Sequence, residues 1–281
     1  MPIQIALMGA GGKMGCRLTD NLMKHTQQYK MDFVEISKDG IANLAGRGLQ
    51  TTPQSEALQN AEVVILALPD RLIGKITHEI VPILPSGSMI ISLDPAAAYA
   101  DVMLIRDDLT YFVAHPCHAP VFNDETTAEA RSDWFGGVHA KQNIVCALHR
   151  GTEDDYARGE AIAKAMYAPV INAYRVTVEQ MAILEPALVE TTLATLLTGL
   201  RQALDLAVDM GVPEDAARAF LFGHIRTELA IIFDLSGFPF SDGALLAIDQ
   251  AYDKIFRPDW KEQIMNIAAL KRSVGEITDS L

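Results

Sequence analysis

A glycine-rich segment near the N-terminus constrains the fold more than any other part of the sequence. An apolar run, Ile3 to Met8, is followed at once by Gly9, Gly11, Gly12 and Gly15, and then by a helical pattern. This order is typical of a buried strand that enters a glycine turn and then a helix. Such a turn lets a pyrophosphate approach the backbone, and the helix N-terminus then holds the phosphate charge. The segment therefore predicts a dinucleotide-binding fold.

An acidic residue at the end of the next strand indicates which dinucleotide is bound. Glu35 lies 20 residues after Gly15, at the end of a strand predicted over Phe33 to Ile36. A carboxylate there accepts a hydrogen bond from a ribose 2′-hydroxyl and repels a 2′-phosphate, which favours NAD over NADP. Ser37 and Lys38 could accommodate a 2′-phosphate if the strand ended later. The predicted cofactor-binding residues are Gly9, Ala10, Gly11, Gly12, Lys13, Met14, Gly15, Glu35, Leu68, Pro69 and Asp70.

The first half of the chain alternates strands with helices, which predicts an α/β fold with a doubly wound parallel sheet. Its further strands are predicted at Ala61 to Pro69, Gly87 to Asp94, Tyr111 to His115 and Lys141 to Leu148. Ligands of such sheets bind beyond the carboxyl ends of the strands. The segments that start at Asp70, Asp94 and His115 should therefore face one crevice.

The apolar period becomes helical after about Asp154, which predicts an all-α C-terminal domain over residues 151–281 behind a nucleotide domain over residues 1–150. Val178 to Met210 predicts one helix of about 30 residues, about 45 Å long. A small domain cannot cover so long an apolar helix. We therefore expect it to pack against a second subunit in a homodimer.

Composition excludes several classes of partner. The formal net charge is −13 over 281 residues, and like charge repels nucleic acid and anionic membranes. The N-terminus begins with the first strand rather than with a leader, and no apolar run is expected to reach the length of a membrane span. Three widely spaced cysteines do not suggest a disulfide framework. We therefore expect a cytoplasmic protein with a small-molecule substrate.

The segment YFVAHPCHAPVFN, Tyr111 to Asn123, is the first candidate for chemistry. His115 ends a strand, and Pro116 after it prevents the strand from continuing, which turns the imidazole toward the crevice. A histidine there can act as a general base or as a metal ligand. His118 and Cys117 favour the metal reading, although their spacing does not match a structural zinc pattern.

The segment EQMAILEPALVE, Glu179 to Glu190, is the second candidate. Glu185 lies in it among apolar residues, on the same predicted helix face as Met181 and Val189. Burying a charge is costly unless a cation accompanies it, so a metal or a proton-transfer role would explain the placement. The alternative is an exposed glutamate without a role.

Several longer motifs together resemble one enzyme family. They are GAGGKMG, HPCH with FNDE close behind, AKQNIVCAL, MYAPV, RVTVEQMAILEP and FRPDWK, spread over residues 9 to 261. They resemble the D-apionate oxidoisomerases, a group within the 6-phosphogluconate dehydrogenase and 3-hydroxyacid dehydrogenase superfamily. Ala119 departs from the expected motif, in which proline follows HPCH. The resemblance implies NAD-dependent oxidation and isomerisation of D-apionate to 3-oxoisoapionate, a Rossmann domain, a helical domain and a homodimer.

This reaction would use the two candidate segments together. Hydride leaves C2 of the substrate, and a hydroxymethyl group then migrates from C3 to C2, which needs a polarised carbonyl and a deprotonated hydroxyl. A divalent cation held by His115 and Glu185 could supply both, and a mixed nitrogen and oxygen set suits zinc or another first-row ion. His118 is the third catalytic candidate, and the identity of the base stays open.

Two other functions are compatible with parts of the sequence. A metal-free 2- or 3-hydroxyacid dehydrogenase of this superfamily would use a lysine of the helical domain, but Val178 to Met210 contains none. A non-catalytic dinucleotide sensor would not need the HPCH segment at the crevice. Both alternatives therefore fit less well than the oxidoisomerase.

Overall fold

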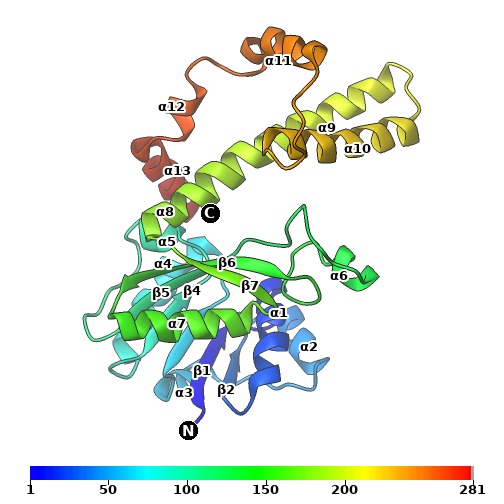
Figure 1. Ribbon diagram of the computed structural model, residues 1–281. Helices are drawn as coiled ribbons and strands as arrows, with labels where there is room; N and C mark the ends of the chain where they lie inside the picture. Colours follow the sequence, from blue (N-terminus) through cyan, green and yellow to red (C-terminus); the bar gives the residue numbers. More distant parts are fainter. Residues whose placement is uncertain (280–281) are drawn as a thin grey trace. The chain divides into compact units, whose positions relative to one another are not determined.

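The computed structural model describes residues 1–279 and divides into two compact units. The first unit comprises Met1–Leu184 with Lys271–Leu281, and the second comprises Glu185–Leu270. The first contains the β-sheet, and the second is built from helices (Figure 1).

The first unit is built on one seven-stranded sheet. In hydrogen-bonded order its strands are β2 (Tyr29–Val34), β1 (Ile3–Met8), β3 (Val63–Leu66), β4 (Met89–Ser92), β5 (Thr110–Pro116), β6 (Gln142–Arg150) and β7 (Val170–Arg175). All neighbouring pairs are parallel except β5 and β6. The predicted doubly wound sheet is confirmed, with β5 and β6 as its one antiparallel pair of neighbours. The connection between these two strands carries the short helix α6 (Ala128–Ser132).

Helices cover both faces of this sheet. They are α1 (Lys13–Leu22), α2 (Lys38–Ala45), α3 (Gln54–Gln59), α4 (Asp70–Ile80), α5 (Ala96–Tyr99), α7 (Glu153–Met166) and α8 (Val178–Ala182), with 3₁₀ turns at Met23–His25 and Val81–Ile83. The buried side chains of α1, α2 and α7 belong to one hydrophobic cluster, and those of α3, α4, α5 and α8 belong to another. The unit is therefore a three-layer α/β/α structure.

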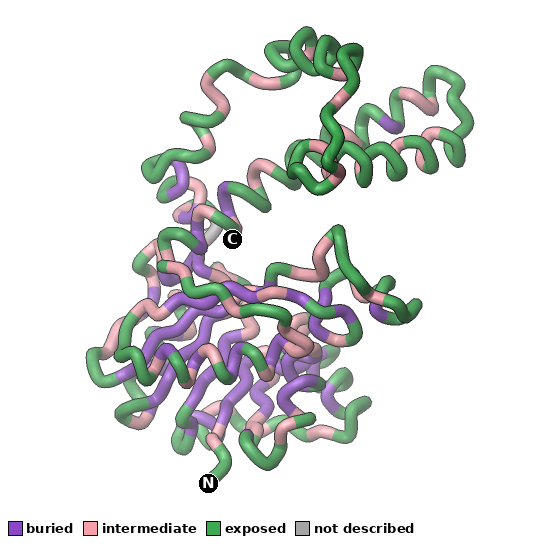
Figure 2. The backbone as a smooth tube through the Cα atoms, viewed as in Figure 1, coloured by how far each residue is buried: buried purple, intermediate pink, exposed green. Residues whose placement is uncertain are grey.

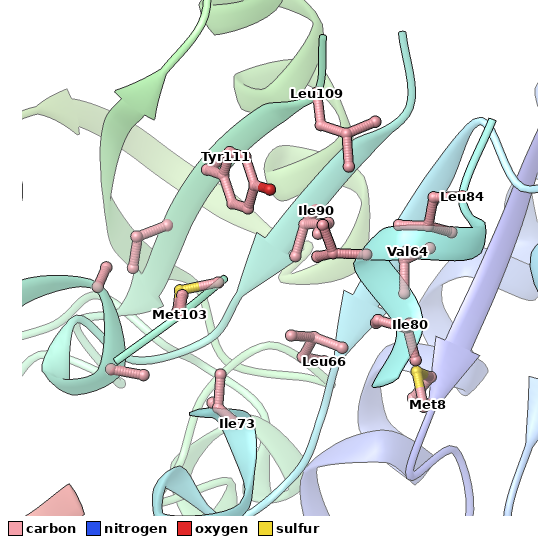
Figure 3. Close-up of a cluster of buried hydrophobic side chains, with 14 of the residues drawn as sticks. Met8, Val64, Leu66, Ile73, Ile80, Leu84, Ile90, Met103, Leu109 and Tyr111 are labelled. Atoms are coloured by element: carbon pink, nitrogen blue, oxygen red, sulfur yellow. The ribbon is translucent and has the colours of Figure 1, made fainter. Parts of the chain in front are cut away.

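Successive residues of the central strands point to opposite layers. On β1, Ala6 and Met8 belong to the cluster under α4, whereas Ile5 and Leu7 belong to the cluster under α1 and α7. Figure 3 shows the cluster under α4, in which Met8 lies with side chains of β3 and β4. Strands buried on both faces need apolar residues at every position, which explains the continuous apolar runs of the sequence.

The sheet extends past residue 150, the expected end of the nucleotide domain. β7 pairs in parallel with β6, and α7 packs on the same cluster as α1. The compact unit therefore continues to Leu184, and the structural division differs from the expected domain boundary. Sequence periodicity could not indicate this, because β7 is only partly buried and carries several polar residues.

The second unit consists of consecutive helices. A π-helical stretch, Ile183–Leu193, continues α8 and leads into α9 (Ala194–Asp209), α10 (Glu214–Ile232), α11 (Asp242–Ile255) and α12 (Trp260–Ile264). The last helix, α13 (Ile267–Asp279), begins in this unit, and from Lys271 on it belongs to the first unit. Pro186 lies inside the π-helical stretch. Proline lacks an N–H group and clashes with the preceding turn, so a wider helical turn at this point has a local cause. The long helix predicted over Val178 to Met210 is thus confirmed, with an irregular middle.

This unit has little core of its own. Within Glu185–Leu270, all of which the structure describes, the buried residues are Pro186, Ala187, Leu204, Ala269 and Leu270. Figure 2 shows α9, α10 and α11 as mostly exposed, whereas the strands of the sheet are buried. Many of the exposed residues are large and apolar; Phe220 of α10 is 70% exposed.

Within the described residues, one helical run is long and apolar enough to cross a membrane when judged by length and composition. It is the helical run Val178–Asp209, which has 32 residues. An 18-residue stretch of it has a mean hydropathy of 1.3, and 22% of that stretch is buried. The expectation that no apolar run reaches the length of a span is therefore wrong. Helices that pack on other protein surfaces meet the same criteria, so this finding alone does not identify the partner of the helix.

Candidate active site

The glycine turn has the close packing that its sequence predicts. Gly9 has φ +74°, and a Cβ at this position would lie 2.3 Å from the carbonyl oxygen of Ala67. A Cβ on Gly15 would lie 2.0 Å from the carbonyl oxygen of Gly9. The N–H of Gly9 donates to the carbonyl of Val34, which joins the turn to the end of β2. Only glycine allows this backbone to turn from β1 into α1.

The N-terminus of α1 is suited to an anion. Gly12 occupies the N-cap position without a side-chain cap, and the first turn contains no acidic residue. The first N–H groups of a helix lack partners within the helix and attract negative charge. Lys13 begins the helix, and its Nζ lies 3.9 Å from the centre of the Phe135 ring. The predicted phosphate-binding role of Gly9 to Gly15 has this geometric basis.

Glu35 follows β2 directly, as a ribose-binding carboxylate should. Its Oε1 accepts hydrogen bonds from the N–H groups of Ile36 and Ser37, and its Oε2 accepts one from the N–H of Gly11. Burial opposes the charged form, but the three N–H donors outweigh it and hold the pKa of this carboxyl below its usual value. Because β2 ends at Val34 and Ser37 caps α2, the later strand end that would have favoured a 2′-phosphate does not occur.

A cavity of about 190 Å³ opens at the carboxyl ends of β3, β4 and β5. Its lining includes Met14, Leu68, Asp70, Asp94 and His115. The crevice expected from the strand ends is confirmed. The structure thus brings His115 together with three of the predicted cofactor-binding residues, in a pocket whose apolar walls suit an aromatic ring. Pro69, the residue between Leu68 and Asp70, is the N-cap of α4.

His115 has a defined tautomer. Its Nδ1 lies 2.8 Å from the carbonyl oxygen of Leu93, so Nδ1 carries the hydrogen and donates it. In the neutral ring Nε2 then holds the lone pair, as a metal ligand or a base requires. The side chain is 17% exposed. The buried hydroxyl of Tyr167 donates to the carbonyl of Ala114 and fixes the end of β5 next to this ring.

Asp94 belongs to the site and was not named among the site residues predicted from the sequence. Its Oδ2 lies 4.0 Å from Nδ1 of His115, while its Oδ1 accepts a hydrogen bond from the N–H of Ala96 at the start of α5. The hydrogen bond from Ala96 therefore fixes the orientation of the carboxylate beside the imidazole. The sequence does contain a signal for Asp94: it is an acidic residue directly after an apolar strand, which is the same pattern that led to the prediction of Asp70.

His118 lies close to His115, with 6.3 Å between the ring centres. Its Nδ1 lies 2.9 Å from the carbonyl oxygen of Phe135, so this ring also keeps its lone pair on Nε2. Its φ of +62° is in the left-handed region, which costs a non-glycine residue about 1 kcal/mol or more. Strained backbone of this kind concentrates at functional sites, which supports the predicted role of His118.

The loop that holds His118 is fastened to α1. Arg17 donates to Oδ1 of Asp133 at 3.1 Å and also to the carbonyl of Gly136. Oδ2 of Asp133 accepts hydrogen bonds from three consecutive backbone N–H groups, at residues 138–140. Asn21 of α1 donates to the carbonyl of Gly137. The dinucleotide-binding helix and the loop carrying His118 therefore form one connected structure.

The remaining predicted residues are placed as follows. Glu185 is the first residue of the second unit and lies in the π-helical stretch, where it is only half-buried. Its carboxylate is therefore not fully buried, and Leu188 and Val189 beside it are exposed. Cys117, next to His115, is exposed.

A complete metal site is not found among the described residues 1–279: no group of three or more His, Cys, Asp or Glu side chains is arranged to hold a metal ion. A cation bound by His115 would therefore depend on further ligands from water or substrate oxygens. The predicted role of Glu185 as a metal ligand stays a prediction.

Comparison with known proteins gives a consistent family. Residues 123–278 match the family model described as phosphogluconate dehydrogenase (decarboxylating) C-term. The D-apionate oxidoisomerase of Cupriavidus necator is 50% identical over 279 residues, covering 99% of this chain and 100% of the relative. That of Rhizobium rhizogenes is 52% identical over 275 residues, covering 98% and 99%.

A solved structure agrees over the full length. The crystal structure of a semialdehyde dehydrogenase NAD-binding protein from Cupriavidus necator, in complex with calcium and NAD, is similar with a TM-score of 0.95 and 48% identity. The similarity covers 99% of this chain and 100% of that one. The N-terminal Rossmann fold and the helical C-terminal part predicted from the sequence are confirmed. The chain belongs to the D-apionate oxidoisomerase family.

Proposed function

We propose that this protein catalyses the NAD-dependent oxidation and isomerisation of D-apionate to 3-oxoisoapionate. The observation that carries the proposal is the pocket at the strand ends, where His115 and Asp94 lie next to the residues of the dinucleotide turn. The family relationship supports the substrate, since relatives with 50% and 52% identity carry this name. The NAD-bound structure of a similar protein supports the cofactor.

The residues of the first unit have separate tasks in this reaction. The N–H groups at the start of α1 bind the pyrophosphate, and Glu35 accepts a ribose hydroxyl. NAD, when bound, takes the hydride from C2 of the substrate. His118 accepts the proton of the substrate hydroxyl at Nε2, because its Nδ1–H is already given to the carbonyl of Phe135. The carbonyl of Leu93 orients the imidazole of His115, and the charge of Asp94 lies 4.0 Å from Nδ1 of that ring.

We further propose that a divalent cation binds with the substrate at His115 and Glu185. The fixed Nδ1–H of His115 leaves Nε2 as the coordinating atom, and a glutamate offers carboxylate oxygens. Such an ion would polarise the C2 carbonyl and lower the pKa of the C3 hydroxyl during the carbon shift. A ligand set of one nitrogen and one oxygen donor favours zinc or another first-row ion. The similar structure from Cupriavidus necator is in complex with calcium, an ion that prefers oxygen ligands. Zinc stays a prediction.

The cation proposal is tested with purified protein, NAD⁺ and D-apionate. We expect NADH formation to stop on chelation and to return when zinc, manganese, magnesium or calcium is added. His115→Ala and Glu185→Gln should each lose turnover and bound metal but keep the wild-type affinity for NADH, because the glycine turn is elsewhere. Full activity of metal-stripped enzyme would contradict the cation, and absence of NADH formation under every metal condition would contradict the substrate.

We also propose a homodimer formed by the helical unit. A segment that buries so few residues cannot be held together by its own core, and a second copy is the partner that is always present. Leu206 of α9 is 62% exposed and Phe238, after α10, is 77% exposed, as expected for residues of a subunit interface. A cytoplasmic location, as predicted from the sequence, also stays a proposal.

Light scattering tests the dimer. The wild type should have twice the monomer mass at micromolar concentrations without detergent, and Leu206→Glu should shift it toward the monomer. Gln202→Glu, at an exposed polar position of the same helix, adds the same charge as a control. Monomer mass for the wild type would contradict the dimer, and recovery only in the membrane fraction would indicate that Val178–Asp209 meets lipid instead.

A further inference from the structure

Gly40 occupies a position of α2 where a side chain has no room, and the reason is a carboxylate. A Cβ on Gly40 would lie 2.4 Å from Cδ and 2.5 Å from Oε2 of Glu35. Gly40 is buried in the first turn of the helix, where its N–H donates to the hydroxyl of Ser37. Its backbone is helical and does not itself require glycine. The glycine is therefore explained by the space that Glu35 occupies.

The carboxylate of Glu35 can move aside only by giving up hydrogen bonds, because its oxygens are already engaged. Oε1 accepts from the N–H of Ile36 at 2.8 Å and from the N–H of Ser37 at 2.9 Å, while Oε2 accepts from the N–H of Gly11 at 3.0 Å. A carboxylate has about four lone-pair directions. Backbone N–H groups use three of them, and the hydroxyl of Ser37 also donates to this carboxylate. The protein itself thus holds the Glu35 carboxylate in one orientation, with Oε2 against Gly11.

A second glycine contact brings α2 against the phosphate-binding turn. A Cβ on Gly11 would lie 2.1 Å from the carbonyl oxygen of Gly40. The side-chain amide of Asn43, one turn further along α2, donates to the carbonyl of Gly11 at 2.9 Å. The turn, the carboxylate and the first turn of α2 therefore fix one another, and Gly40 is the member that leaves space for Glu35.

We propose that Gly40 is a specificity-determining residue for the cofactor: it leaves room for the Glu35 carboxylate to lie against Gly11, where it accepts a ribose hydroxyl and repels a 2′-phosphate. This inference rests on the proposed use of NAD. A methyl group at position 40 turns the carboxylate away from Gly11. The NAD preference then falls although Glu35 is still present.

The test measures dissociation constants for NADH and NADPH by fluorescence titration, together with kcat/KM for NAD⁺ and NADP⁺. We expect Gly40→Ala to reduce the preference for NADH over NADPH at least tenfold, mainly through weaker NADH binding. Gly46→Ala is the matched control at the end of the same helix, because its Cβ would meet its nearest neighbours at 3.5 Å and 3.6 Å, which is ordinary contact. This control should keep the wild-type preference.

A double-mutant cycle shows whether Gly40 acts through Glu35. Glu35→Ala alone should lose the preference, and adding Gly40→Ala to it should change the preference no further. Equal additional losses in both backgrounds, or an unchanged preference in Gly40→Ala, would overturn the inference. If Gly40→Ala does not fold, the double variant Glu35→Asp, Gly40→Ala replaces it, because the shorter aspartate leaves room for the methyl group. The preference of this double variant for NADH over NADPH must then lie below that of the wild type. A wild type without preference would instead contradict the proposed use of NAD over NADP.

Discussion

Asp133 allows a quantitative test of how the loop between β5 and β6 is held, because its two carboxylate oxygens have separate partners. Oδ2 accepts from the N–H groups of Val138, His139 and Ala140, and Oδ1 accepts from Arg17. In Asp133→Asn the amide oxygen can still serve the three N–H groups. The amide NH₂ must then face the guanidinium, which places donor against donor.

The size of the effect follows from these contacts. The side chain of Asp133 is 7% exposed, so its interactions are little screened by solvent. A hydrogen bond to a charged group contributes about 1.5–3 kcal/mol and a neutral one about 1 kcal/mol. Losing the ion pair and making three charged bonds neutral should lower the free energy of unfolding by about 3 kcal/mol. Asp133→Ala also removes the three neutral bonds that Asp133→Asn keeps, at about 1 kcal/mol each, so it should lower the free energy of unfolding by about 6 kcal/mol.

The same contacts predict a pH dependence. Burial opposes the charge of Asp133, but the N–H donors and Arg17 outweigh it, so the pKa of the folded state lies below the unfolded value. A depressed carboxyl pKa contributes stability that is fully present above the unfolded pKa, about 3.9, and is lost as the pH falls through the folded pKa. The difference between the wild type and Asp133→Asn should therefore be constant from weakly acidic to neutral pH and should shrink below about pH 4.

Urea unfolding measured at several pH values checks both statements. Asp20→Asn is the control, because the pair of Asp20 with Arg47 is exposed, at 47% and 34%, and should contribute about 0.5 kcal/mol or less. The reasoning is refuted if Asp133→Asn is no more destabilising than this control. It is also refuted if the difference from the wild type stays constant below pH 4.

Three further outcomes are expected. Gly159→Ala should lower the free energy of unfolding, measured by urea titration, by about 1–3 kcal/mol, because its Cβ would lie 2.6 Å from the ring of Phe112. Gly275→Ala is the control: a Cβ there meets open space, so this change should be neutral or slightly stabilising in the same titration. The free energy of unfolding of His118→Gly should exceed that of His118→Ala by about 1 kcal/mol, since glycine adopts the positive φ freely. Both variants should lose turnover. Equal stability of the two variants would contradict backbone strain at this position. Asp94→Asn should keep the hydrogen bond from the N–H of Ala96, since its amide oxygen can still accept it, and yet lose at least tenfold in kcat; unchanged kcat would remove Asp94 from the site.

The parts of the fold set by local pattern could be predicted from the sequence. The continuous apolar runs of β1, β3, β4 and β5 identify strands buried on both faces, and the glycines after β1 identify the turn. His115 was found because a proline follows it at the end of such a run. Each of these signals lies within a few neighbouring residues, so that one stretch of sequence contains the whole argument.

Features set by distant contacts could not be predicted in this way. The direction of β6 depends on how its connection crosses the sheet, and β7 has too few apolar residues to reveal itself. Asp133 is important because Arg17, far away in the sequence, meets it. Glu185 was expected to be buried because its neighbours are apolar, but Leu188 and Val189 beside it are exposed in the described part of the chain.

The small core of Glu185–Leu270 has a consequence for how stability should be measured. If this unit gains its free energy of folding from a second copy, then its stability is set by mass action and has no single value. Each tenfold dilution would remove about 1.4 kcal/mol of the free energy of dissociation into unfolded helices. The melting temperature of the helical unit would then rise with protein concentration, while that of the sheet, with its own two-sided core, would change little.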